Sequence, residues 1–200
     1  MDKQLLQQVI DEVVKRTFDS ITNLFKNNDD INSPTRLYFP KYVHGVNSGE
    51  IRVSEQELRQ LFIEEFGKNS DVAKLNLRYS VETPTQGWYV FSEEAKNDGR
   101  SGNFDFTIFK NREIVAIIEF KAGNAKSYKT DLEKLSSGDE GDANTLRYLI
   151  NILVGADKGT VNNINSKFQS SADGERMVHL RFHSMNNPEF DEQFPKFYKY

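Results

Sequence analysis

The chain has 200 residues, no cysteine and a formal net charge of −4. The absence of cysteine excludes a disulfide framework and any thiolate metal site. The negative charge excludes a global basic field, so contact with a polyanion requires a local patch or a bound cation. No apolar run approaches the roughly 20 residues that span a bilayer. The first residues begin a polar and apolar helical pattern rather than a basic leader, and we expect a cytoplasmic protein without membrane contact.

Residues 1–50 predict a helical extension followed by a loop. Apolar side chains recur at three- and four-residue spacing from Asp2 to Phe25, which is typical of an amphipathic helix. Prolines and glycines interrupt the next segment, "TRLYFPKYVHGVNSGEI", which predicts an ordered loop. We expect residues 1–50 to pack on a core formed by residues 51–200. The apolar stripe of the helix also raises the possibility of a homodimer, in which a second copy covers it.

The core begins with a well-capped helix. Ser54 is a good N-cap, Glu57 completes a capping box three residues later, and Gly67 ends the helix. Strands are expected over Leu77–Thr83, Asn103–Phe109, Ile114–Lys121, 146–156 and 176–184, with an optional strand at Trp88–Phe91, and helices over Ala125–Ser136 and Thr160–Ser170. This order predicts an α/β fold in which helices flank a mixed central sheet.

The strand Ile114–Lys121 ends in two charges. Its side chains are apolar on both faces for most of its length, which is typical of a central strand. Because side chains alternate, Glu119 and Lys121 share a face with Val115 and Ile117. A carboxylate and an ammonium at the end of a buried strand are costly, so we expect them to have a protein partner, a metal or a chemical role.

Asp105 on the preceding strand is the natural partner of Glu119. A three-residue turn, Asn111–Glu113, places Asp105 directly opposite Glu119. A two-residue turn places Asp105 opposite Ile118, on the other face of the sheet. A site shared by the two carboxylates therefore predicts an odd-length turn or a β-bulge.

Two opposed carboxylates favour a divalent cation. Directly opposed Cβ atoms lie about 4.5–5.5 Å apart, and the two negative charges repel each other unless a cation lies between them. Hard oxygen ligands suit Mg²⁺, for which Mn²⁺ substitutes. Lys121 points to the same side as Glu119, within reach of a metal-bound water or a phosphate oxygen. These residues outline a site that hydrolyses phosphodiester bonds.

The spacing of Asp105, thirteen further residues and then Glu119-Phe120-Lys121 resembles the PD-(D/E)XK nuclease superfamily, which has a restriction-endonuclease-like fold. The expected helix, three strands, helix and strand match its αβββαβ core over about Ser54–Met185. The resemblance implies a metal-dependent deoxyribonuclease that binds DNA. Asp105, Glu119 and the Phe120 carbonyl would hold Mg²⁺, and Lys121 would orient or activate the water. Where the family has a nominal proline before the first aspartate, this chain has a phenylalanine.

The family usually adds one more acidic residue. The segment "SEQELRQLF" resembles the corresponding helix of archaeal Holliday-junction resolvases, which assigns this role to Glu55. Glu55 is also explained as a first-turn carboxylate that the helix dipole favours. Glu65 falls on the same stripe and is the alternative. Glu82, in "VETP", resembles the first-strand glutamate of some members and is the third candidate.

Other residues carry weaker indications. Arg100, Lys126 and Lys129 are candidate DNA contacts, although each alone is also explained as an ordinary surface cation. His179 and His183 are about 13 Å apart along one strand, too far to share a metal. The alternative function is a non-catalytic interaction or assembly module that keeps the nuclease fold. In that case the Glu-x-Lys ending is an ion-paired strand terminus.

Overall fold

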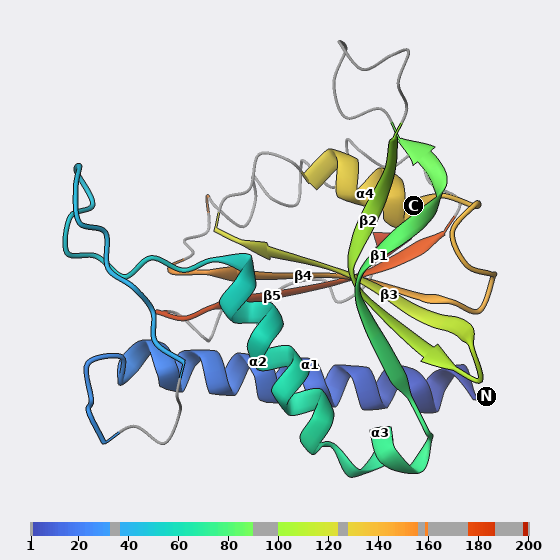
Figure 1. Cartoon of the computed structure of the whole chain (residues 1–200), viewed down its shortest axis with the longest axis horizontal. Coiled ribbons are helices and arrows are strands. Elements are labelled where there is room, and N and C mark those ends of the chain that lie inside the picture. Colours follow the sequence, from blue (N-terminus) through green and yellow to red (C-terminus); the bar gives the residue numbers. More distant parts are fainter. Residues whose placement is uncertain are drawn as a thin grey trace.

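The computed structural model describes residues 2–32, 37–89, 100–123, 128–155, 159, 176–186 and 198–199. The helices are α1 (Lys3–Lys26), α2 (Glu55–Lys68), α3 (Ser70–Lys74) and α4 (Tyr128–Ser136). The strands are β1 (Arg78–Tyr89), β2 (Arg100–Lys110), β3 (Glu113–Ala122), β4 (Leu146–Leu153), β5 (Met177–Ser184) and β6 (Tyr198–Lys199). Figure 1 shows their arrangement around the sheet.

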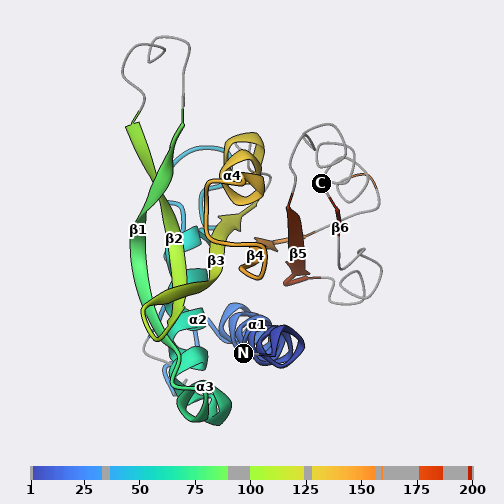
Figure 2. The ribbon, with the colours of Figure 1, turned by 90° about the vertical axis from the view of Figure 1, so that its right-hand side faces the viewer.

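The sheet is mixed, as the sequence predicts. Strand β2 pairs antiparallel with both β1 and β3, whereas β4 pairs parallel with both β3 and β5. The short strand β6 pairs antiparallel with β5. Figure 2 shows α4 on one side of the sheet and α1 on the other. The expected α/β fold, with a mixed central sheet flanked by helices and preceded by an N-terminal helix, is confirmed at this level.

Helix ends follow local capping chemistry. Asp2 caps α1 by accepting a hydrogen bond from the Gln4 backbone nitrogen at 2.9 Å. Ser54 and Glu57 form the predicted capping box at the start of α2. The short helix α3 was not expected from the apolar pattern, and the Asn69 side chain caps it. Side-chain acceptors satisfy N–H groups that have no partner within the first helical turn.

Some expected elements differ from those observed. Residues 88 and 89 belong to β1, so they continue this strand rather than form a separate one. The first three residues of the helix predicted over Ala125–Ser136 lie outside the described residues, as does the whole predicted helix Thr160–Ser170. The β4 strand ends at Leu153, earlier than predicted.

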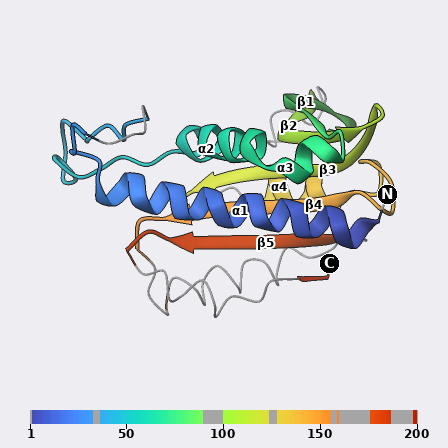
Figure 3. The same ribbon diagram turned by 90° about the horizontal axis from the view of Figure 1, so that it is seen from below.

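Two apolar clusters cover the faces of the sheet. One contains buried side chains of α1 and α2, and the other contains buried side chains of α4. Val9 and Val13 of α1 are buried in the first cluster, and Figure 3 shows α1 and α2 lying across the same side of the sheet. The apolar stripe of α1 is therefore used within the chain, and the predicted homodimer loses the observation that motivated it. In the described ranges, no helix combines the length and apolar character needed to cross a bilayer.

Phe62 of α2 should be among the most sensitive core positions. Its ring is fully buried and lies 5.2 Å from the Phe106 ring and 5.3 Å from the Phe120 ring, measured between centroids. Phe62→Ala should lower the free energy of unfolding by about 3–5 kcal/mol, because it leaves a cavity between α2 and the strands. Urea denaturation measures this loss. Val46→Ala, at a fully exposed loop position, should change stability by less than about 0.5 kcal/mol.

His179 of β5 should make the fold sensitive to acid. Burial, together with the charges of Arg181 and Lys3, lowers its pKa to about 4. Because this folded-state pKa lies below the unfolded value, the stabilising contribution is fully present above about pH 6.5 and is lost as the pH falls through about 4. The free energy of unfolding should fall by up to about 3 kcal/mol when this contribution is lost. Urea unfolding at pH 7 and pH 4.5 should show a smaller loss in the free energy of unfolding for His179→Phe than for the parent. An equal loss in the two proteins would contradict this assignment to His179.

Candidate functional site

The pairing of β2 and β3 contains the predicted irregularity. Lys110 pairs with Glu113 across a turn made of residues 111–112, so the turn has two residues rather than three. The register then shifts at a β-bulge, and farther along Phe106 pairs with Ile118. A bulge adds one residue to one strand and so has the same effect on register as an odd-length turn. Of the two predicted alternatives, the chain uses the bulge.

This register directs Asp105 toward the end of β3. The pair Phe106 and Ile118 is the last of the ladder, and the next contact is made by a side chain. Asp105 Oδ2 accepts a hydrogen bond from the Phe120 backbone nitrogen at 2.8 Å. The carboxylate thus takes the place of a backbone acceptor where the two strands separate. Asp105 lies beside Glu119, as the sequence predicts.

The bulge also corrects the predicted faces of β3. Ile114 and Val115 each pack on the face opposite to the predicted one, because Val115 contacts the α1 and α2 cluster and Ile114 contacts the α4 cluster. A bulge reverses the alternation of side chains on one side of itself. Beyond it, Ile117 contacts the α4 cluster, and Glu119 and Lys121 face α4 with it.

Glu119 is paired with a lysine of α4. Its side chain is 2% exposed, and Oε1 forms an ion pair with Lys134 Nζ. Lys134 Nζ also lies 3.2 Å from Asp131 Oδ1 and donates a hydrogen bond to the Asn103 carbonyl oxygen at 3.0 Å. Burial and the negative charge of Asp105 raise the pKa of Glu119 well above its usual range, and Lys134 opposes this rise.

Lys121 is paired with carboxylates of two helices. Its ammonium lies 2.9 Å from Asp131 Oδ2 and 3.5 Å from Glu55 Oε1. Burial alone would lower its pKa, but the carboxylates of Asp131, Glu55 and Glu119 raise it above its usual value. Lys121 is therefore protonated at neutral pH. It can donate hydrogen bonds and stabilise negative charge, but it cannot act as a general base.

Glu55 is the most accessible of the site carboxylates whose ion pairs are described, with 42% of its side chain exposed. Burial raises its pKa, the Lys121 charge opposes the rise, and the charges of Asp105 and Asp131 add to it. A carboxylate with a raised pKa is a stronger proton acceptor than a free one. The structure thus places Glu55 beside Lys121, and the role predicted for Glu55 in the site stays a prediction.

The two other candidate acids lie elsewhere. Glu65 accepts hydrogen bonds from Ser20 of α1 at 3.2 Å and from Lys68 at 2.8 Å, so it faces α1 and not β3. The predicted apolar stripe of α2 is correct, but α1 covers the C-terminal part of the helix, which carries Glu65. Glu82 is exposed and forms an ion pair with Arg59. Neither residue joins the site.

The predicted DNA contacts are not placed. Lys126 lies outside the described residues, and the side chains of Arg100 and Lys129 are not described. The structure records the backbone amide of Phe120 bonded to Asp105, whereas the proposed role of its carbonyl oxygen stays a prediction.

Sequence reasoning missed Asp131 and Lys134. Both lie in α4, three residues apart, and both are buried. They flank Leu132 and Leu135, which belong to the apolar stripe of α4. Acidic and basic residues beside such a stripe usually point to solvent. The available signal was their spacing, since residues three apart on a helix share a face and these two adjoin the stripe that covers the sheet.

Asn151 of β4 supports the same end of the site. It is fully buried and pairs with Lys121 in the parallel register of β3 and β4. Its Nδ2 lies 3.4 Å from the Gly123 carbonyl oxygen and also contacts the Tyr128 hydroxyl. The amide thus links the end of β3 to the start of α4, which carries Asp131 and Lys134.

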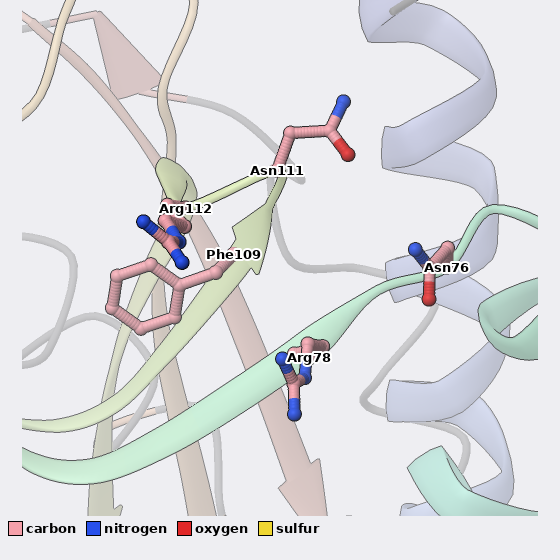
Figure 4. Close-up of a pocket in the computed structure, with 5 residues that line it drawn as sticks. All are labelled: Asn76, Arg78, Phe109, Asn111 and Arg112. Atoms are coloured by element: carbon pink, nitrogen blue, oxygen red, sulfur yellow. The ribbon is translucent and has the colours of Figure 1, made fainter.

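Two surface pockets show where a larger ligand would find space. Figure 4 shows a pocket of about 510 Å³ lined by Asn76, Arg78, Phe109, Asn111 and Arg112. It adjoins the turn between β2 and β3, at the opposite end of β3 from Glu119. A second pocket, of about 560 Å³, is lined by Ala122 and Gly123 together with Tyr42 and Ile51 of the loop before α2. Ala122 packs against the α1 and α2 cluster, whereas Lys121 faces α4, so this pocket adjoins the end of β3 on the opposite face of the strand from Lys121.

The donor set suits a hard divalent cation. Asp105, Glu119, Glu55 and Asp131 are carboxylates, and the hydrogen bond that Asp105 accepts from the Phe120 nitrogen engages its Oδ2. Across the described part of the chain, no three His, Cys, Asp or Glu side chains already form a metal-binding group. The reason is visible in the ion pairs, because Lys121 and Lys134 lie between the carboxylates.

Comparisons of this chain with known families, proteins and structures found no similar protein. No protein-family model, curated protein or solved structure matches this chain.

Proposed function

We propose that this chain is a Mg²⁺-dependent nuclease of the PD-(D/E)XK type, with a restriction-endonuclease-like fold, that hydrolyses phosphodiester bonds of DNA. The observation that supports this function best is the convergence of Asp105, Glu119, Lys121 and Glu55 where β2 and β3 separate. A β-bulge produces the register that brings Asp105 to this point. An ion-paired strand terminus has no need of that register.

Each residue has a role that follows from its surroundings. Asp105 and Glu119, with the Phe120 carbonyl, would hold the cation. When bound, Mg²⁺ supplies an activated water and stabilises charge on the phosphate. Lys121, held between Asp131 and Glu55, would donate hydrogen bonds to a phosphate oxygen and stabilise the negative charge that develops there. Glu55, with its raised pKa, would accept a proton from the attacking water.

A cleavage panel tests the function. The purified chain would be incubated with linear, circular, single-stranded and branched DNA and with RNA, each with Mg²⁺, Mn²⁺ or EDTA. We expect metal-dependent cleavage of at least one DNA. Glu55→Gln should lower the rate by about 10² or more, the scale of losing an acid or base group. Glu64→Gln is the matched control, because Glu64 is an exposed carboxylate of the same helix. Cleavage of RNA alone would exclude a deoxyribonuclease.

One observation favours the alternative, a non-catalytic interaction or assembly module. Glu55, Asp131 and Glu119 are each paired with Lys121 or Lys134, so these charges are balanced within the protein. A non-catalytic module that keeps the fold requires only that its buried charges are balanced in this way. Mn²⁺ titration discriminates the two functions, since a module without catalysis has no reason to bind Mn²⁺ at Asp105.

A further inference from the structure

Lys134 occupies a central position among the site carboxylates. Its side chain is 7% exposed, and its ammonium contacts Glu119, Asp131 and the Asn103 carbonyl oxygen. The same ammonium lies 5.7 Å from the centroid of the Phe104 ring. One positive charge therefore lies where oxygen atoms from β2, β3 and α4 converge. A divalent cation bound by Asp105 and Glu119 would compete with this ammonium for the Glu119 carboxylate.

Asp131 provides Lys134 with a second partner. It pairs with Lys134 through Oδ1 and with Lys121 through Oδ2. If another cation took Glu119, the Lys134 ammonium would still be paired with Asp131, three residues before it on the same helix. Lys134 can thus release Glu119 without leaving a buried ammonium unpaired, which would be strongly unfavourable.

We propose that Lys134 is the internal counter-ion of Glu119 in the metal-free protein and that a divalent cation displaces it toward Asp131. This inference rests on the proposed function, because it presumes a cation at Asp105 and Glu119. A buried carboxylate needs a positive partner, and the metal-free site supplies one from α4. Lys134 is accordingly a positioning residue that competes with the metal for Glu119.

Lys134→Met separates competition from simple structural support. Without the lysine, Glu119 lacks its counter-ion, so the thermal midpoint in EDTA should fall relative to the parent. Mn²⁺ should then bind at least about tenfold more tightly, because it no longer displaces an ammonium. Calorimetric titration with Mn²⁺ and thermal unfolding with and without Mn²⁺ measure both effects. We expect a larger Mn²⁺-induced rise in midpoint for the variant than for the parent.

Two further variants keep the test decisive. Lys134→Gln retains a hydrogen-bond donor for Glu119 without the charge, and it should show the same tightening if Lys134→Met does not fold. Lys74→Met is the matched control, because Lys74 forms an exposed ion pair with Asp71 at 2.7 Å. It should leave Mn²⁺ affinity unchanged.

The outcomes distinguish this inference from the function on which it rests. If the parent binds Mn²⁺ through Asp105 but the Lys134 variants bind it equally or more weakly, Lys134 is only a structural partner and the inference is overturned. If only the Lys134 variants bind Mn²⁺, competition by Lys134 is supported. If neither the parent nor the variants bind Mn²⁺, both the inference and the metal-dependent function are overturned.

Discussion

Replacing Asp105 by alanine should abolish Mn²⁺ binding and reduce DNA cleavage by about 10² or more. Glu55, Asp131 and Glu119 each pair with a lysine, whereas Asp105 is held by the backbone, because its Oδ2 accepts a hydrogen bond from the Phe120 nitrogen. Burial and the negative charge of Asp105 both raise the pKa of Glu119. A cation shared by them would remove this repulsion, and without Asp105 it would lose a principal ligand.

Asp105→Asn sharpens the experiment. The amide oxygen can still accept the hydrogen bond from the Phe120 nitrogen, so the end of the β2 and β3 ladder should be preserved. The charge is lost, and Mn²⁺ affinity and cleavage should fall together, as in Asp105→Ala. Asp139→Asn, at an exposed loop position, is the control. Mn²⁺ affinity that is unchanged in both Asp105 variants would show that the metal site is wrongly assigned.

The sequence predicted the register between β2 and β3 but not how the chain achieves it. Apolar alternation located both strands, and the need to bring Asp105 to Glu119 required an odd turn or a bulge. A three-residue turn gives one register along the whole ladder. A two-residue turn that is followed by a bulge gives the same register beyond the bulge. Only packing distinguishes them, because Ile114 and Val115 take opposite faces in the two cases.

The acidic residues of α2 show a second point that the sequence pattern did not predict. Glu55 and Glu65 lie on one stripe of the helix, and the pattern alone gave Glu55 only a preference. The structure separates them because α1 crosses the part of α2 that carries Glu65, where Ser20 meets it. Such helix-on-helix packing depends on side-chain ridges and grooves over the whole contact, which no local pattern records.

Asp131 and Lys134 of α4 show a third point that the sequence pattern did not predict. The sequence predicted the helix and its apolar stripe, and it named Lys121 as the catalytic lysine, with Lys126 and Lys129 as candidate DNA contacts. Whether Asp131 and Lys134 point to solvent or to the sheet depends on a small rotation of α4 about its axis. Their burial follows from the charges they meet, because Glu119 and Lys121 each need a partner of opposite sign.

Replacing Lys121 by alanine should separate catalysis from metal binding. The substitution removes a cation that repels the metal, so Mn²⁺ should bind as tightly as in the parent or slightly more tightly. Cleavage should nevertheless fall by about 10² or more, because the phosphate loses the charge that Asp131 and Glu55 hold in place. Mn²⁺ titration and single-turnover cleavage, measured on the same preparation, give the two quantities.

The effect of Lys121→Ala should differ from that of Lys134→Met. Lys134 contacts Glu119 directly, whereas the described ion pairs of Lys121 are with Asp131 and Glu55. Removal of Lys134 should therefore tighten Mn²⁺ binding strongly, and removal of Lys121 should mainly slow cleavage. Lys68→Ala, which removes an exposed lysine of α2 that pairs with the buried Glu65 away from the site, should change neither quantity. If Lys121→Ala cuts DNA at the parental rate, Lys121 has no part in the reaction, and its pairing with Asp131 and Glu55 serves only to balance buried charge at the end of β3.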